Sequence, residues 1–318
     1  MTGRRRSAPR TPAASEPAVD RTTADRSSTT VRARGLLPSL SPAEQRVARV
    51  IIDEAATAAG LTISDLADRA RSSETTVIRF CRAMGFTGYS HLRLTLAAEA
   101  GRASEATTAD GAVGSDISET DELAQVVKKI AFADARAVEE TAVQIDIAVL
   151  ERVVGLVAGA RRVDIYGVGA SAFVAGDFQQ KLHRIGRIAY AWSDLHMALT
   201  SAALLDERDV AFGISHTGTT LDTIEAFAEA GRHGARTVAL TNFPKSPITE
   251  VADLVLTTAA RETTFRSGAM ASRLAQLTVI DCVFVGVAQR TYAETRKALD
   301  ATYDAVRSRR VGPGRWHG

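Results

Sequence analysis

The sequence of 318 residues lacks the features that mark several protein classes. Its two cysteines, Cys81 and Cys282, lie far apart in no metal-ligand or redox spacing, so we expect reduced packing residues in a cytoplasmic protein. No run of about 18 apolar residues occurs, which argues against a membrane-spanning helix. The arginines near the N-terminus are not followed by the apolar stretch of a secretory signal. No His, Cys and Asp cluster has metal-ligand spacing, and we expect neither a metal nor a cofactor.

The chain has little excess charge of either sign, because its net charge is only +2. Its distribution is uneven: residues 1–37 carry eight arginines against three acids. That segment is rich in Arg, Ser, Thr, Ala and Pro without apolar periodicity, so we expect a disordered basic tail. The rest of the chain is long enough to predict two domains.

Residues 62–81 have the pattern of a helix-turn-helix. Thr62, with Asp65 three residues on, predicts the start of a short helix, and Ser73 predicts the start of a second helix that Gly85 ends. The N-terminal part of such a second helix faces base edges in the major groove, where Arg can bind guanine and Thr can bind bases. The residues that we expect to be exposed toward DNA are Ser73, Glu74, Thr75, Thr76, Arg79 and Arg82.

A helical hairpin with a solvated face is the alternative, since residues 38–100 contain seven basic and seven acidic side chains. A longer string resolves the choice. Residues 63–92, ISDLADRARSSETTVIRFCRAMGFTGYSHL, resemble the helix-turn-helix of RpiR-type regulators. The resemblance implies DNA binding, with residues 75–82 as the recognition helix.

The second half of the sequence alternates short apolar runs with helical patterns. This alternation predicts right-handed βαβ units and an α/β fold with a doubly wound parallel sheet. The expected strands are 163–166, 188–190, 210–214, 238–240 and 254–256. Two long helices, over residues 120–145 and 267–289, frame this region.

Two loops that follow expected strands are suited to phosphate. Residues 167–171 (GVGAS) and 215–220 (SHTGTT) combine glycines, which allow close backbone approach, with hydroxyls that can donate to phosphate oxygens. Each loop opens a helix, whose N-terminus attracts anions. Both lie at carboxyl ends of parallel strands, where open α/β sheets bind ligands.

A dinucleotide site is the rival interpretation of the first loop. Gly167 and Gly169 are present, but the third glycine is missing from its register and the next strand lacks a terminal acid for a ribose. The region instead resembles the sugar isomerase (SIS) fold, which forms the C-terminal half of RpiR-type regulators. That resemblance implies a phosphorylated sugar as ligand.

On the SIS resemblance, Ser171, Ser215, Thr217 and Thr220 hold the phosphate, and Asp222 supports the loop from behind. Glu262 and Arg266 match a region that touches the sugar in this fold, although either could be structural. The ligand-binding residues that we expect are Gly169, Ser171, Ser215, His216, Thr217, Gly218, Thr220 and Glu262.

The sequence therefore predicts a cytoplasmic, nucleoid-associated transcription regulator of carbohydrate genes that responds to a sugar phosphate. We expect it to bind palindromic double-stranded DNA as a homodimer or homotetramer, with the two long helices as contacts. A sugar-phosphate isomerase or lyase is the alternative, and an inactive scaffold a third. The expected parts are a tail (1–37), a helix-turn-helix domain (38–100), a linker (101–119), a SIS domain with connecting helices (120–290), and a C-terminal helix and tail (291–318).

Overall fold

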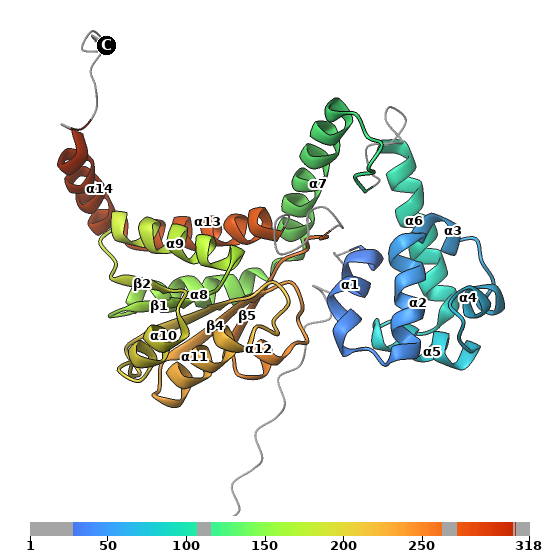
Figure 1. The fold of residues 1–318 in the computed structure, drawn as a ribbon, viewed down its shortest axis with the longest axis horizontal. Helices are drawn as coiled ribbons and strands as arrows, with labels where there is room; N and C mark the ends of the chain where they lie inside the picture. Colours follow the sequence, from blue (N-terminus) through green and yellow to red (C-terminus); the bar gives the residue numbers. More distant parts are fainter. Residues whose placement is uncertain (1–27, 107–115, 263–271, 308, 310–318) are drawn as a thin grey trace, which may run out of the picture.

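The computed structural model describes residues 28–106, 116–262, 272–307 and 309. A helical N-terminal domain and an α/β domain are joined through a long helix, and both parts are visible in Figure 1. Within the described residues, no helix is long and apolar enough to cross a bilayer.

The N-terminal domain is built from short helices around one apolar core. They are α1 (Thr29–Leu36), the 3-10 turn η1 (Leu37–Ser39), α2 (Pro42–Asp53), α3 (Ala55–Ala58), α4 (Ile63–Arg69), α5 (Glu74–Ala83) and α6 (Tyr89–Ala106). The expected cap of α4 is confirmed, because the Asp65 backbone N–H donates to Thr62 Oγ1 at 3.2 Å. Ile51, Leu66 and Phe80 are fully buried in the core of this domain.

The prediction that residues 1–37 are a disordered tail is wrong for residues 29–37, which form α1 and the start of η1. Val31, Ala33 and Leu36 are buried, so this segment does have a core to join. The expected linker also begins too early, since α6 continues to Ala106. Our predicted helix over 120–145 is observed as α7 (Leu123–Gln144).

The α/β domain is a five-stranded parallel sheet in the order β2-β1-β3-β4-β5, which confirms the doubly wound fold. The strands are β1 (Val163–Tyr166), β2 (Ala189–Trp192), β3 (Val210–Ile214), β4 (Arg236–Thr241) and β5 (Leu254–Thr257). From β1 the strand order runs to β2 on one side and to β3, β4 and β5 on the other, so the reversal point of the strand order lies between β1 and β3. Ligands of such sheets bind at the carboxyl ends of the strands at this point.

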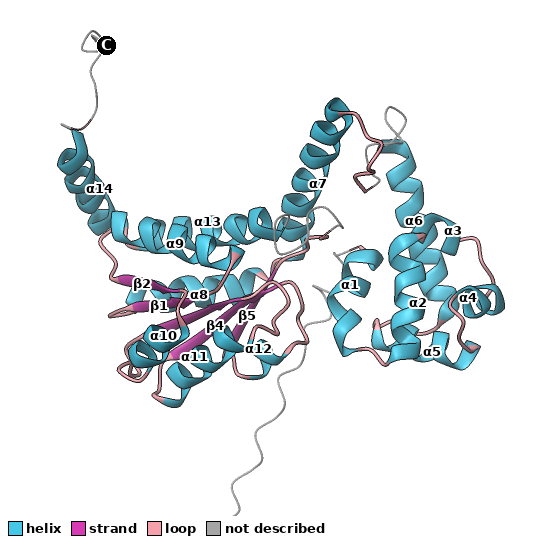
Figure 2. Ribbon diagram, in the orientation of Figure 1, coloured by secondary structure: helices cyan, strands magenta, loops and turns pink. Residues whose placement is uncertain are grey.

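Helices cover both faces of the sheet, as Figure 2 shows. Helices α8 (Ile147–Gly159), α9 (Ala170–Arg184) and α13 (Ser272–Arg290) share one apolar core with the sheet. Helices α10 (Leu195–Ala202) and α11 (Leu221–Arg232) share a second core on the opposite face. The remaining helices are α12 (Pro247–Glu250) and α14 (Tyr292–Arg307).

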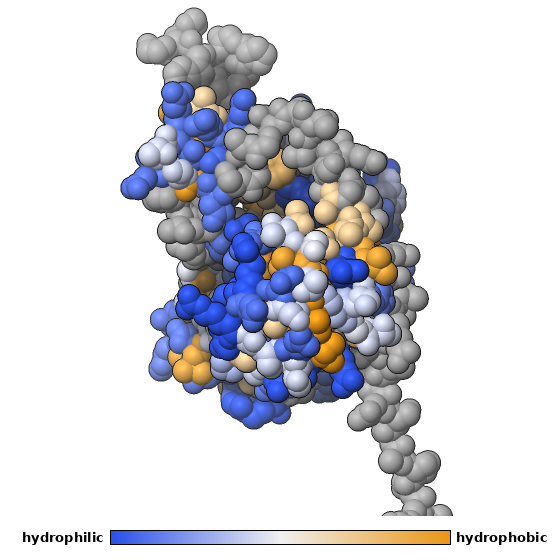
Figure 3. Space-filling model, turned by 90° about the vertical axis from the view of Figure 1, so that its right-hand side faces the viewer, coloured by the Kyte–Doolittle hydropathy of each residue, from blue (hydrophilic) through white to orange (hydrophobic). Residues whose placement is uncertain are grey.

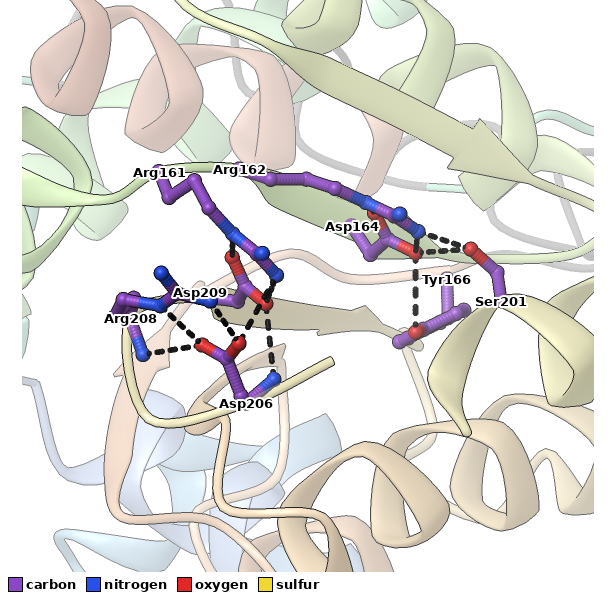
Figure 4. Close-up of polar contacts among 8 residues, drawn as sticks. All are labelled: Arg161, Arg162, Asp164, Tyr166, Ser201, Asp206, Arg208 and Asp209. Atoms are coloured by element: carbon purple, nitrogen blue, oxygen red, sulfur yellow. Dashed lines mark hydrogen bonds and ion pairs between the residues drawn. The ribbon is translucent and has the colours of Figure 1, made fainter. Parts of the chain in front are cut away.

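The buried carboxylate of Asp164 links β1 to β2 and α10, and Figure 4 shows part of this group of contacts. The Asp164 side chain is fully buried and accepts hydrogen bonds from Ser201 Oγ at 2.6 Å and Trp192 Nε1 at 2.8 Å. Arg162 binds the same carboxylate with two nitrogens, at 2.6 and 2.7 Å. At the amino end of β3, Asp209 is held in a similar way by Arg161. These hydrogen bonds and ion pairs hold neighbouring elements of the domain together, so we assign Asp164 and Asp209 a structural role.

Removing the charge of Asp164 should therefore destabilise the fold. We expect Asp164→Asn to lower the free energy of unfolding by about 3 kcal/mol, because it leaves a half-buried guanidinium without its counter-charge. Asp177→Asn removes a more exposed partner of Lys181 and should cost less than about 1 kcal/mol. Urea unfolding of the two variants compares these values; an equal loss in both would contradict this role of Asp164.

Candidate functional site

Helices α4 and α5 form the expected helix-turn-helix. Ser73 caps α5, since its Oγ accepts the Thr76 backbone N–H at 3.3 Å. The side chains of Ser73, Glu74, Thr75, Arg79 and Arg82 are exposed, as predicted. These residues therefore form a continuous candidate surface for DNA on one helix and its cap.

The prediction that Thr76 is exposed toward DNA is wrong. Only 8% of this residue is accessible, and its Oγ1 lies 3.0 Å from Ser73 Oγ. Thr76 belongs to the capping turn, in which the helix turns its third residue inward. Its contribution is to hold the start of α5.

Arg79 is bound to α2 in the free protein. Its Nε donates to Glu44 Oε1 at 3.1 Å and one terminal nitrogen donates to Ser41 Oγ at 3.2 Å. Hydrogen bonds from Ser41 and Arg79 lower the pKa of Glu44 below its usual value. The guanidinium remains more than half exposed, so it can exchange this partner for DNA.

Sequence reasoning missed a residue that fixes the turn of this motif. Arg71 lies in the left-handed region, with φ of 46°, which is uncommon for a residue other than glycine. Its carbonyl oxygen accepts hydrogen bonds from Arg46 on α2 at 3.0 and 3.3 Å. Only the fold brings these residues together, since 25 positions separate them.

Figure 3 views the side of the molecule on which the N-terminal helices lie. Hydrophilic and near-neutral side chains cover most of the coloured surface, and hydrophobic ones lie among them in smaller groups. A polar surface of this kind is compatible with contact to a solvated sugar-phosphate backbone.

The loop from Ser215 to Thr220 lies between β3 and α11. Ser215 is 2% exposed, and its Oγ accepts the Gly218 backbone N–H at 3.1 Å and lies 3.0 Å from Thr220 Oγ1. Thr217 is exposed, and its Oγ1 accepts a hydrogen bond from the Thr219 hydroxyl at 2.8 Å. The loop thus gathers four hydroxyls in one tight turn, as the sequence predicts.

Gly218 is required by the shape of this loop. Its φ is +66°, and a Cβ there would lie 2.1 Å from Ser246 Oγ and 3.0 Å from Thr241 Oγ1. Its carbonyl oxygen accepts the Ile248 backbone N–H at 3.0 Å. The loop therefore packs on the segment that follows β4, a neighbour that the sequence did not reveal.

The first predicted loop lies beside it, since β1 pairs directly with β3. Gly169 has φ of +58° and immediately precedes α9, whose first turn contains the buried Ser171. At Gly167 an added Cβ would lie 3.0 Å from the Ser171 carbonyl oxygen, so the backbone turns closely there. Both predicted loops thus reach the carboxyl edge at the reversal point.

His216 and Glu262 lie near each other at this edge. Burial lowers the pKa of His216 below its ordinary value, and the Glu262 carboxylate partly opposes that change. Burial thus disfavours the charged imidazole, and its buried Nδ1 has no hydrogen-bond partner in the part of the chain that the structure describes. The backbone carbonyl of His216 accepts from Asn242 N–H at 3.0 Å.

Glu262 also has a structural contact, because its Oε1 accepts the backbone N–H of Ser272, the first described residue of α13, at 2.8 Å. Arg266 lies outside the described residues. Asn242 was missed by sequence reasoning: its side-chain oxygen accepts the Ala260 N–H at 2.7 Å and orients the segment that leads to Glu262. Among the described residues, no group of three or more His, Cys, Asp or Glu side chains could hold a metal ion.

Comparisons with known proteins agree with a helical N-terminal domain followed by an α/β domain. Residues 34–103 match the model of the rpiR-family helix-turn-helix domain, and residues 156–286 match that of the SIS domain. An uncharacterised helix-turn-helix transcriptional regulator of Caldanaerobacter subterraneus is 36% identical over 278 residues, covering 87% of this chain and 96% of the relative.

Two solved structures are similar as well. The Vibrio vulnificus NanR protein, complexed with ManNAc-6P, has a TM-score of 0.56 at 29% identity over 89% of this chain and all of that one. A candidate sugar-phosphate isomerase from Listeria monocytogenes has a TM-score of 0.52 at 19% identity over 58% of this chain and 99% of that one, which shows the fold alone. With both domains in place, the chain belongs to the RpiR family of helix-turn-helix transcription regulators that carry a SIS domain.

Proposed function

We propose that this regulator binds a phosphorylated sugar at the loops after β1 and β3 and that this binding changes its affinity for operator DNA. The observation that carries the proposal is the hydroxyl cluster of residues 215–220, held in shape by Gly218 at the reversal point of the sheet. Such a turn supplies neutral donors beside a helix N-terminus, which suits a phosphate dianion. The similar Vibrio protein was solved with a sugar phosphate, which supports the ligand class.

The residues that we propose for the sugar phosphate are the predicted set: Gly169, Ser171, Ser215, His216, Thr217, Gly218, Thr220 and Glu262. Ser215, Thr217 and Thr220 would donate to phosphate oxygens. His216 lies within the loop with its ring packed against Phe243, and we propose that it contributes its backbone. For DNA we propose Ser73, Glu74, Thr75, Arg79 and Arg82, with Thr76 as a residue of the cap.

A thermal-shift panel tests the ligand class. ManNAc-6P, other hexosamine phosphates, pentose phosphates and inorganic phosphate are added to the full chain, with the unphosphorylated sugars as controls. A sugar phosphate at about 100 times its dissociation constant should stabilise the protein by about 2.7 kcal/mol. No stabilisation by any phosphate would contradict the proposal.

Catalysis by the same site is the second candidate, since isomerases share the fold and Glu262 lies close enough to His216 to influence its pKa. An isomerase needs a base beside C1 and C2 of the sugar and an acid that opens the ring. Glu262 is the only plausible base in the proposed set, and its Oε1 already accepts the Ser272 N–H, so we propose that the protein binds without turnover. Proton NMR of each stabilising sugar phosphate, incubated with the protein, would reveal an isomer if this is wrong.

We further propose that the protein acts as a homodimer or homotetramer on a palindromic operator, with half-sites about 34 Å apart or a multiple of that. Helix α7 exposes Leu123 and Val127, 78% and 62% accessible, one turn apart on the same face. Since large apolar side chains on one exposed face mark contact surfaces, α7 is the candidate for subunit contact.

Polar substitution of that face should weaken assembly. We expect Leu123→Ser, Val127→Ser to lower the assembly state seen by light scattering, with a dissociation constant raised at least about tenfold, because two side chains of apolar burial are lost. Leu204→Ser, on an exposed apolar residue after α10, is the matched control and should leave assembly unchanged. An unchanged mass for the double variant would place the contact elsewhere.

A further inference from the structure

Helix α1 is held to α6 of the N-terminal domain through its first turn. The Thr29 backbone N–H and hydroxyl both donate to the Glu99 carboxylate on α6, each at 2.9 Å. Val31, Ala33 and Leu36 are buried, and Ala33 and Leu36 belong to the core of the helix-turn-helix domain. A displacement of α1 would therefore displace the helices packed on it, because close-packed interiors transmit strain.

The last turn of α1 rests on the α/β domain. An added Cβ at Gly35 would lie 3.2 Å from Pro244 Cδ and 3.8 Å from the Asn242 carbonyl oxygen. Arg34 lies 4.0 Å from the Glu140 carboxylate on α7. Burial lowers the pKa of Arg34, and the nearby Arg261 lowers it further against the opposing effect of Glu140. Figure 1 shows α1 between α2 and the α/β domain.

The segment that Gly35 touches also touches the phosphate loop. This turn, residues 242–246 between β4 and α12, binds the His216 carbonyl through the Asn242 N–H at 3.0 Å. Phe243 packs edge-on against the His216 ring, with centroids 5.6 Å apart. Ser246 occupies the space beside Gly218. One five-residue turn is thus in contact with the proposed ligand loop on one side and with α1 on the other.

We propose that the contact of α1 with the 242–246 turn is the surface through which occupancy of the phosphate loop reaches the helix-turn-helix domain of the same chain. A dianion that draws the hydroxyls and backbone of residues 215–220 inward moves His216 and Gly218. The turn bonded to them moves with them, and Gly35 leaves no side chain to absorb the change. The inference rests on the proposed function and names the element that couples its two sites.

The test uses Gly35→Leu in the full chain, which places a bulky side chain against Pro244. Gly176→Leu is the matched control, because no described atom beyond its own stretch of α9 lies within 4 Å of a Cβ at that glycine. Hydrogen exchange without any ligand is measured first. Gly35→Leu should increase exchange at least about fivefold in residues 215–220, which are not among the nearest neighbours of a Cβ at position 35, and Gly176→Leu should not. In the reverse direction, Gly218→Ala should increase exchange at residues 31–36.

Operator affinity with and without ManNAc-6P or inorganic phosphate is measured second. If the wild type changes its operator affinity by a typical coupling factor of about 5–150-fold, Gly35→Leu should reduce that factor to less than about 2 while still binding operator. Coupling that persists in Gly35→Leu, or exchange at residues 215–220 equal to that of the wild type, overturns the inference. A wild type that responds to no sugar phosphate contradicts the proposed function instead, and the exchange measurements still decide the inference.

Discussion

The double variant Ser215→Ala, Thr217→Ala is expected to bind its sugar phosphate about 100-fold more weakly or worse, while still binding operator DNA. Each hydroxyl would donate to a charged phosphate oxygen, and such hydrogen bonds contribute about 1.5–3 kcal/mol. Isothermal titration or thermal shift with the stabilising sugar phosphate measures the loss. Thr200→Ala removes an exposed hydroxyl that bonds only to the His196 carbonyl among the described residues, and should leave binding unchanged.

Stability must be separated from binding in this variant. Ser215 Oγ accepts the buried Gly218 N–H, so its removal leaves that donor without its acceptor and should cost about 1–3 kcal/mol of folding free energy. Thr217 is exposed, so Thr217→Ala alone should weaken ligand binding without that loss. Full ligand affinity in the folded double variant would show that the phosphate binds elsewhere.

Arg79→Ala is expected to lower affinity for the operator by about 1–3 kcal/mol, roughly 5–150-fold, and to relax the sequence preference at one position. The reason is that a guanidinium on the exposed face of α5 can bind a guanine with two hydrogen bonds. Fluorescence anisotropy with operator and with scrambled DNA measures both changes. Arg69→Ala, on the exposed side of α4, should affect the two DNAs alike.

Glu44→Gln tests whether Arg79 contacts DNA bases or instead holds α5 against α2 through its ion pair with Glu44. In the free protein Glu44 accepts Arg79 Nε at 3.1 Å, and binding a base would require Arg79 to leave it. Weakening that contact should leave operator affinity within about threefold of the wild type or improve it. If Glu44→Gln instead lowers affinity as much as Arg79→Ala, the pair acts by holding α2 on α5.

Local signals in the sequence were enough for α4, α5, the strands of the sheet and the positions of the two loops, but not for α1. The cap at Ser73, the Thr62–Asp65 pair and the glycines at strand ends act within a few residues, so their spacing alone predicts their structure. The strand pattern succeeds because β1, β3 and nearly all of β4 are buried on both faces, which gives continuous apolar runs. It placed β2 slightly early, since Ile188 is 54% exposed and the strand runs Ala189–Trp192.

Contacts over long sequence distances explain what the sequence could not predict. Helix α1 shows no single apolar stripe because it packs against the helix-turn-helix domain on one side and the α/β domain on the other. The role of Asn242 depends on a turn that meets the phosphate loop only in the folded sheet. Thr76 has the same side-chain chemistry as its exposed neighbour Thr75, and only its place in the capping turn buries it.

The most direct measurement is the affinity of the full chain for operator DNA with and without a saturating sugar phosphate. Sequencing of genomic fragments that the protein retains supplies the operator, and anisotropy at fixed salt supplies the two dissociation constants. We predict that they differ by about 5–150-fold, and that the same factor appears in the sugar-phosphate affinity when operator is added, since coupling between two binding sites is reciprocal. Equal constants at a sugar-phosphate concentration that stabilises the protein would contradict the account.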